Sequence, residues 1–141
     1  MWLFQLESSA EVSAALRSYP KDFQIWNSLS VADLAKDGIA IQRAINVQVS
    51  GHVEVATLRT VGGYLVPVVN ATCYQSEIGE QLNVRYPDNP FAACYFDRAD
   101  GRRQWSLRSK GDFDVSEVAQ RFGGGGHRNA AGYVEAIATP P

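Results

Sequence analysis

The spacing of apolar residues over residues 1–54 predicts helices. A capping-box pattern at Ser8 opens a helix over Ala10–Ser18. A second cap-like residue, Ser30, precedes a longer helix that is expected to end near His52. Within this longer helix, apolar residues and a glycine recur at steps of three and four, which places them on one stripe: Val31, Leu34, Gly38, Ile41, Ile45 and Val49.

After residue 54 the pattern changes to short β-rich runs that are broken by turn residues. The expected strands are Val55–Val61, Tyr64–Asn70, Phe91–Asp97, Arg103–Ser109 and Gly132–Ala138, and the expected helices are Gln75–Leu82 and Asp114–Phe122. Gly-Gly separates the first two strands and Asp-Gly the next two, which is the turn chemistry of β-hairpins. We therefore predict an α/β (α+β) fold with a mixed sheet of about five strands and short helices. This domain spans residues 55–141 and follows a helical connector or arm over residues 1–54.

Charge is unevenly distributed along the chain. The formal net charge is −2, with 13 Lys plus Arg against 15 Asp plus Glu. Residues 98–128 nevertheless hold seven of the cations and only four of the anions. A local basic field of this kind favours anionic ligands, although a solvated face that keeps the domain soluble is an equally good explanation of the charge alone.

No segment is typical of a membrane span or a secretory signal. The longest uncharged run, Thr60–Ser76, is interrupted by two glycines, Pro67 and Asn70. The first residues have no basic head, and their apolar stretch is too short for a signal peptide. We expect a cytoplasmic protein that does not contact a membrane.

The sequence offers few metal-binding or redox residues. Cys73 and Cys94 match no metal or redox spacing, and we expect both to be buried free thiols. With two histidines and no paired cysteines, an ordinary zinc site is hard to build. The pair Asp112 and Asp114 could ligate a metal, but turn and helix-cap roles are more typical of such a pair. We expect no catalytic residue, metal ligand or cofactor in this chain.

Four consecutive glycines, Gly123–Gly126, precede His127. Each glycine costs about 0.5–1 kcal/mol of backbone entropy relative to Ala, which a domain tolerates where φ is positive or where something approaches the main chain closely. Successive N–H groups there could form a nest for an anion, with a following helical turn adding its positive end and His127 donating a hydrogen bond to a phosphate oxygen. The pattern is neither a P-loop nor a Rossmann motif. A flexible linker is the alternative, but Phe122 and Ala130–Tyr133 on either side are typical of packed segments.

The strand that precedes the glycines carries an arginine. Alternation places Ser106 and Arg108 on one face, and Trp105, Leu107 and Ser109 on the other. An arginine beside a phosphate-binding loop can pair bidentately with phosphate or lie flat on a base. The alternative is a surface arginine whose stem covers the sheet.

Several of these segments together resemble a known family. They are Val69-Asn70-Ala71, Ser76-Glu77-Ile78-Gly79, Ser106-Leu107-Arg108-Ser109, Asp114-Val115-Ser116-Glu117-Val118-Ala119 and Phe122-Gly-Gly-Gly-Gly126-His127-x-x-Ala130-Ala131-Gly132. They resemble the DHH-associated C-terminal domain of DHH-family phosphoesterases over about residues 55–138. Residues 1–54, with Tyr19-Pro20-x-x-Phe23-x-x-Trp26, are similar to the connector that follows the catalytic domain in such proteins.

The resemblance implies a function in phosphoester cleavage. In that family an N-terminal domain binds two manganese ions through clustered Asp and His residues, and it cleaves short oligonucleotides, nucleotide bisphosphates, cyclic dinucleotides or single-stranded DNA. The C-terminal domain closes on the substrate and holds it. The resemblance assigns phosphate or nucleotide contact to these residues: Gly124, Gly125, Gly126, His127, Arg108 and Ser109, and less specifically Asn129, Ala130 and Asn70.

The chain departs from the full family pattern because it has no Asp-His-His run. Two-metal catalysis needs several ligands around ions about 4 Å apart, and the sequence does not supply them. We therefore expect a substrate-binding part of a longer manganese-dependent enzyme, of the exonuclease, oligoribonuclease or bisphosphate nucleotidase type. Its partners would be a short single-stranded oligonucleotide or nucleotide and the missing N-terminal catalytic domain, and homodimerisation stays open. The alternatives are a standalone RNA-binding module, like the C-terminal domain of alanyl-tRNA synthetases, and a structural or oligomerisation domain.

Overall fold

The computed structural model describes residue 17 and residues 23–137 of the chain. Two compact units make up the chain, Met1–Gln48 and Val49–Pro141. Apart from Arg17, the helix predicted over Ala10–Ser18 lies outside the described residues. Among the described helices, none is both long and apolar enough to cross a bilayer.

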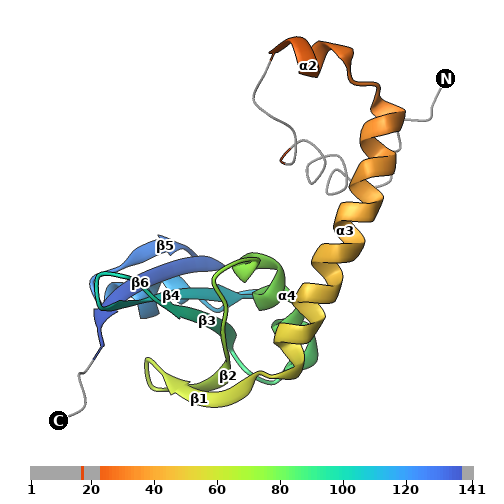
Figure 1. The fold of residues 1–141 in the computed structure, drawn as a ribbon. Helices are drawn as coiled ribbons and strands as arrows, with labels where there is room; N and C mark the ends of the chain where they lie inside the picture. Colours follow the sequence, from red (N-terminus) through yellow and green to blue (C-terminus); the bar gives the residue numbers. More distant parts are fainter. Residues whose placement is uncertain (1–16, 18–22, 138–141) are drawn as a thin grey trace. The chain divides into compact units, whose positions relative to one another are not determined.

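The N-terminal helices begin where the sequence predicts a cap. They are α2 (Phe23–Ser28) and α3 (Val31–Glu54), shown in orange to yellow in Figure 1. The backbone N–H of Asp33 donates to Ser30 Oγ at 3.1 Å, and Ser30 Oγ donates to the Asp33 carboxylate at 2.6 Å, so the predicted cap is confirmed. Most of the predicted stripe is buried, namely Leu34, Gly38, Ile45 and Val49. The first stripe residue, Val31, is an exception with 50% exposure.

A single mixed sheet of six strands, in the order β1-β2-β3-β4-β6-β5, forms the second unit (Figure 1). The strands are β1 (Thr57–Val61), β2 (Tyr64–Asn70), β3 (Phe91–Asp97), β4 (Arg102–Ser109), β5 (Gly125–His127) and β6 (Ala130–Ala136). All neighbours pair antiparallel except β2 and β3, which are parallel. A parallel pair needs a crossover connection, and α4 (Gln75–Arg85) supplies it.

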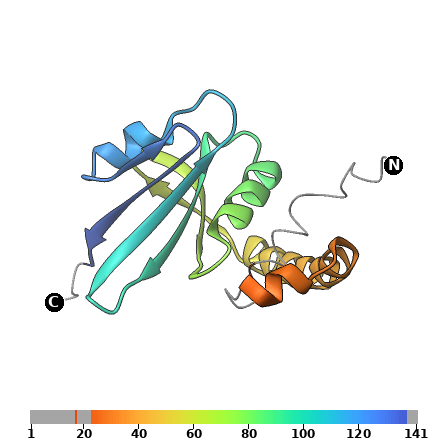
Figure 2. The ribbon, with the colours of Figure 1, turned by 90° about the horizontal axis from the view of Figure 1, so that it is seen from above.

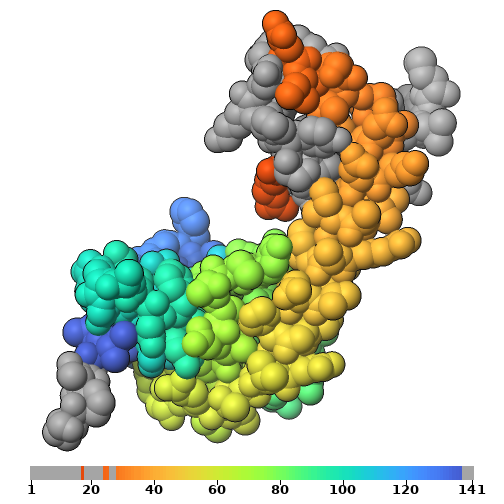
Figure 3. Space-filling view, viewed as in Figure 1, coloured from red at the N-terminus to blue at the C-terminus, as the bar shows by residue number. Residues whose placement is uncertain are grey.

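Both predicted hairpins are present. The β1–β2 turn contains Gly62 and Gly63 at φ 58° and 89°, and the β3–β4 turn contains Gly101 at φ 76°. These left-handed conformations explain the glycines at the turns. In Figure 3, the turn end of the β3–β4 hairpin (teal) lies at the surface of the domain. The predicted mixed α+β fold is therefore confirmed.

Helices α4 and α5 (Val115–Gln120) cover opposite faces of the sheet (Figure 2). The face under α5 holds the main core: Val61, Val66, Val68, Phe91, Ala93, Trp105, Leu107, Val115, Val118, Ala119, Ala131 and Tyr133. On the other face, Ile78 and Leu82 of α4 are fully buried. Along β4 the residues alternate between these faces, so Trp105 and Leu107 are buried on the α5 side, as the sequence predicts.

The sixth strand is the main difference from the predicted architecture. β5 takes Gly125–His127 out of the predicted loop and pairs it with β6 through a two-residue turn at Arg128 and Asn129. Glycines have no side chains, so they carry no alternation of apolar and polar residues that could reveal a strand. The second half of the glycine run, Gly125 and Gly126, is therefore part of the sheet.

The two cysteines differ in exposure. Cys94 on β3 is buried, as predicted, whereas Cys73 in the β2–α4 connection is exposed, so the prediction of a buried thiol is wrong for Cys73. Sequence alone could not reveal that α4 covers only one of the two. Burial raises the pKa of the Cys94 thiol to about 12, and the charge of Arg108 opposes this shift only in part.

We expect only one thiol of the native protein to react rapidly with a disulfide reagent at pH 8. Nucleophilic attack needs the thiolate, and burial keeps Cys94 protonated and shielded. Cys73→Ser should remove the rapid phase, and denaturant should restore a reaction at Cys94. Two rapid equivalents in the native protein would contradict the placement of β3 beneath α4.

Candidate functional site

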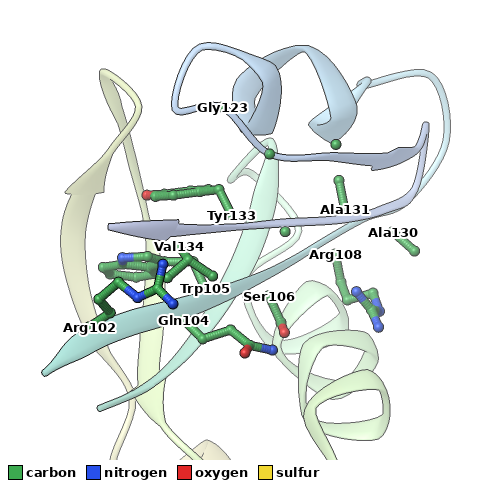
Figure 4. A pocket seen from close by; sticks show the side chains of 13 residues that line it. Arg102, Gln104, Trp105, Ser106, Arg108, Gly123, Ala130, Ala131, Tyr133 and Val134 are labelled. Atoms are coloured by element: carbon green, nitrogen blue, oxygen red, sulfur yellow. The ribbon is translucent and has the colours of Figure 1, made fainter. Parts of the chain in front are cut away.

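A hollow of about 700 Å³ lies against β4 and β6 (Figure 4). Its 13 lining residues come from β4, β6 and the glycine run: Arg102, Gln104, Trp105, Ser106, Arg108, Gly123, Gly124, Gly125, Ala130, Ala131, Gly132, Tyr133 and Val134. Two of them are arginines and none is acidic. Arg102 and Arg108 lie toward opposite ends of β4 in Figure 4. The charged groups of the lining therefore favour an anion.

Arg108 is held by hydrogen bonds at its guanidinium. Nη1 donates to the carbonyl of Leu107 at 2.9 Å, and Nη2 donates to Ser76 Oγ at 2.8 Å. A guanidinium has more N–H donors than these two contacts use, so the planar group is oriented while donors remain for a ligand. The side chain is half-buried, which limits screening of its charge by solvent.

The three neighbouring arginines of the β3–β4 hairpin are partly offset by two aspartates. Arg98 and Arg102 both form ion pairs with Asp100, with nitrogen–oxygen distances of 3.0 and 2.8 Å. Arg103 forms an ion pair with Asp97 at 2.6 Å. Hydrogen bonds from Arg102 and Arg103 lower the pKa of Asp100 and Asp97, respectively.

Arg108 differs from these arginines in its charge environment. Among the ion pairs between described residues, none includes Arg108. Its positive charge is therefore not offset locally, whereas that of Arg102 at the other end of the hollow is offset by Asp100.

A polar network continues from Arg108 to the start of α4. Ser106 Oγ donates to Gln75 Oε1 at 2.8 Å, and Gln75 Nε2 donates to the carbonyl of Ala71 at 2.8 Å. The helix begins after Tyr74, which has φ 55° and is the only non-glycine residue with positive φ in the described part of the chain. Ser106 and Arg108 thus share one face, as predicted, and both are anchored to the first turn of α4.

The glycine run does not form the predicted nest. The N–H of Gly123 donates to the carbonyl of Gln120 at 3.0 Å, and the N–H of Gly124 donates to that of Ala119 at 2.9 Å. Gly123, at φ 75°, ends α5 in the left-handed conformation that is common after helices. The next residues form β5 and a turn, and no helical turn follows them. The amides of the first two glycines are thus already bonded to carbonyls of α5.

Close backbone packing explains three further glycines. A Cβ atom at Gly124 would overlap the Gly132 carbonyl oxygen, and one at Gly126 would lie 2.5 Å from the Ala130 carbonyl oxygen. A Cβ atom at Gly132 would lie 2.5 Å from the Trp105 carbonyl oxygen. Gly125 is different, because nothing lies within 4 Å of its Cβ position. Gly123, Gly124 and Gly125 of the run line the hollow. Of these three, only Gly125 has neither a positive φ nor a close contact that would require a glycine.

Two predicted site residues have structural roles. Ser109 is buried on the α5 side of β4, and its Oγ donates to the Phe113 carbonyl at 2.7 Å. Asn129 donates through Nδ2 to Ser109 Oγ at 2.9 Å and to the Gly111 carbonyl at 3.0 Å. These contacts tie the β4–α5 loop to the β5–β6 turn, and neither side chain lines the hollow.

The structure brings four of the nine predicted residues to the hollow, namely Arg108, Gly124, Gly125 and Ala130. Gly126, His127 and Asn70 do not line it. His127 is exposed at the end of β5, and Asn70 is exposed at the end of β2. The nine residues therefore do not form one cluster.

Sequence reasoning missed the remaining lining residues for identifiable reasons. Arg102 and Gln104 share the alternation of Ser106 and Arg108, so the period of two along β4 could have revealed them. Val134 comes to the hollow through the pairing of β6 with β4, which no local pattern encodes. Phe113 does not line the hollow, because its ring packs on Phe91 in the core.

Tyr133 lines the hollow but offers no free ring face. Its ring stacks between Phe122, with centroids 4.5 Å apart, and Trp105, at 6.0 Å. Burial raises its phenol pKa well above the ordinary value.

The described residues offer no obvious metal site. Within residue 17 and residues 23–137, no three His, Cys, Asp or Glu side chains gather closely enough to hold an ion. Asp114 instead caps α5, where its carboxylate accepts from the backbone N–H of Ser116 at 2.9 Å. The helix-cap role predicted for Asp114 is therefore confirmed.

Parts of this chain are similar in sequence to a family model and to curated proteins. A model of the DHHA1 domain matches residues 76–134. Oligoribonuclease NrnB of Bacillus subtilis (strain 168) is 41% identical over 70 residues, which cover 49% of this chain and 17% of that protein. An uncharacterized protein of Acanthamoeba polyphaga mimivirus is 28% identical over 144 residues, which cover 94% of this chain and 34% of that protein. The chain thus spans about a third or less of the length of these curated relatives.

A solved structure shares the fold. The pGpG-specific phosphodiesterase PggH from Vibrio cholerae superposes with a TM-score of 0.54, over 81% of this chain and 42% of that one, at 12% identity. At 12% identity, this similarity shows a shared fold alone.

We expect Gly124→Ala to destabilise the domain by about 2–3 kcal/mol, because its Cβ atom would overlap the main chain of β6. Gly125→Ala is the matched control, since its Cβ position is open, and its free energy of unfolding should stay within about 1 kcal/mol of wild type. Urea denaturation followed by tryptophan fluorescence measures both. Equal effects at the two positions would contradict the observed packing of the run on β6.

Proposed function

We propose that this chain binds the phosphate group of a short single-stranded oligonucleotide or nucleotide in the hollow beside Arg108, because the lining of this hollow lies within residues 76–134, which match a model of the DHHA1 domain. The domain holds that substrate for a DHH catalytic domain that this chain does not contain. The relationship to a protein named as an oligoribonuclease, at 41% identity over half of the chain, supports this substrate class.

The observation that carries the proposal is the charge environment of Arg108. Its guanidinium is oriented by Leu107 and Ser76 and borders the hollow, and none of the ion pairs found among the described residues offsets its charge. Arginine presents a planar set of donors that matches two phosphate oxygens at once. A fixed, unpaired guanidinium at a concave surface is therefore well suited to a phosphate.

The shape of the hollow also supports a nucleotide. Its volume of about 700 Å³ lies within the range of about 300–1,000 Å³ that is usual for small-molecule sites. Gly125 leaves its main chain open to close approach. A phosphate at Arg108 and a sugar or base along β4 and β6 would fit this elongated lining.

The residues of this chain bind and orient the substrate in this proposal, and they do not cleave it. Manganese, when bound, would supply the charge stabilisation for phosphoester cleavage on the catalytic domain. The described residues give it no ligand set here. The contribution of this chain is therefore substrate affinity and position.

We expect Arg108→Ala to weaken binding of a fluorescent five-nucleotide single-stranded RNA by about tenfold to a hundredfold. This is the loss of affinity expected when one charge-assisted hydrogen-bonding contact is removed. The slope of log Kd against log salt should fall by about 0.7, as for one lost phosphate contact on a single strand. Fluorescence anisotropy over a salt series measures both quantities. Arg98→Ala is the matched control, since it removes an equal charge that is paired with Asp100 and lies outside the hollow.

Other outcomes would favour the alternative functions. A structured RNA that competes far better than the short oligonucleotide, with the same dependence on Arg108, would favour a standalone RNA-binding module. If no phosphate-bearing ligand binds, or if Arg108→Ala and Arg98→Ala are equally weak in effect, the proposed site is wrong and a structural role remains.

A further inference from the structure

Helix α4 contacts the stem of Arg108 at a single buried glycine. A Cβ atom at Gly79 would lie 2.6 Å from Cγ and 2.8 Å from Cβ of Arg108. Real side chains do not approach so closely, and Arg108 Cβ is fixed by the backbone of β4. Any larger residue at position 79 would therefore displace either the arginine stem or the helix.

Position 79 requires a glycine because there is no space there for a side chain. Gly79 lies inside α4 and is not among the glycines with positive φ. A helix interior disfavours glycine relative to alanine, so its conformation gives no reason for it. The absent side chain instead leaves the volume that the arginine stem occupies.

Two further residues of α4 hold Arg108 from the same side. Ser76 Oγ accepts a hydrogen bond from Nη2 at 2.8 Å, and Asn83 Nδ2 donates to the backbone carbonyl of Arg108 at 3.0 Å. Positions 76, 79 and 83 are three and four residues apart, so they lie on one face of the helix. One stripe of α4 thus contacts the backbone, the stem and the guanidinium of the same residue.

We infer that Ser76, Gly79 and Asn83 are positioning residues that set the direction of the Arg108 guanidinium toward the hollow. This inference rests on the proposed phosphate-binding function. An arginine loses much rotamer freedom when it binds a ligand, and a side chain that is already ordered by its surroundings has less to lose. The stripe would therefore raise affinity without touching the substrate.

The test compares Gly79→Ala with a matched helix glycine. Gly51→Ala, in α3, meets nothing within 4 Å and should leave oligonucleotide binding unchanged. Gly79→Ala should weaken binding of the five-nucleotide RNA by about tenfold and lower the salt slope toward that of Arg108→Ala. Ser76→Ala, at an exposed residue, should weaken it by about threefold and serves as the second variant if Gly79→Ala does not fold.

A double-mutant cycle separates positioning from general damage. If Gly79 acts through Arg108, adding Gly79→Ala to Arg108→Ala should change Kd by less than about twofold. Ile78→Val is the control for a purely structural effect, since Ile78 is a fully buried neighbour, and it should lower stability without changing the salt slope.

The outcomes distinguish this inference from the proposed function. If Arg108→Ala weakens binding while Gly79→Ala and Ser76→Ala do not, the inference is overturned and the proposed function stands. Additive effects of Gly79→Ala and Arg108→Ala would overturn it as well. If Arg108→Ala itself leaves Kd unchanged, the proposed function fails and the inference fails with it.

Discussion

The candidate site depends on a few positions at which packing leaves no room for a Cβ atom. Gly79 admits the stem of Arg108, Gly124 and Gly126 admit the main chain of β6, and Gly132 admits the main chain of β4. Interiors are packed as densely as organic crystals, so a single added carbon at such a point must move a neighbour. Two of these positions, Gly124 and Gly132, also line the hollow.

Ion pairing offsets part of the basic character of residues 98–128. Counting charges along the sequence gives a broad excess of cations, yet Asp97 and Asp100 offset the arginines of the β3–β4 hairpin. Arg108 lies six residues further along the strand from Arg102, at the other end of the hollow, and its guanidinium donates to Ser76 in the first turn of α4. The charge that Arg108 offers to the proposed phosphate contact therefore depends on its position more than on the net charge of the domain.

Local sequence patterns predicted the fold well. The two hairpins follow from glycine turn chemistry, α3 and α5 begin at the predicted caps, and the alternation along β4 places Ser106 and Arg108 on the correct face. Cys73 was misjudged because exposure depends on which segment α4 covers.

The site was only partly predictable. Arg108 was identified because strand alternation and the neighbouring basic residues both point to it. The amides of the glycine run were assigned to a ligand because a sequence cannot distinguish a glycine needed for an anion from one needed for a neighbouring strand. The contributions of Gly79, Ser76 and β6 depend on tertiary pairing between segments far apart in the chain, for example the 32 residues between Ser76 and Arg108.

The parallel pairing of β2 with β3 has a consequence for how the site is acquired during folding. The crossover that joins these strands contains α4, so the helix that holds Arg108 connects two strands that pair in parallel. Bringing together segments far apart in sequence carries a loop-closure entropy that must be overcome before the contacts form. Because Ser76 and Gly79 contact Arg108 only when α4 has packed on β4, a partly assembled chain without this packing would expose the same arginine without a defined orientation.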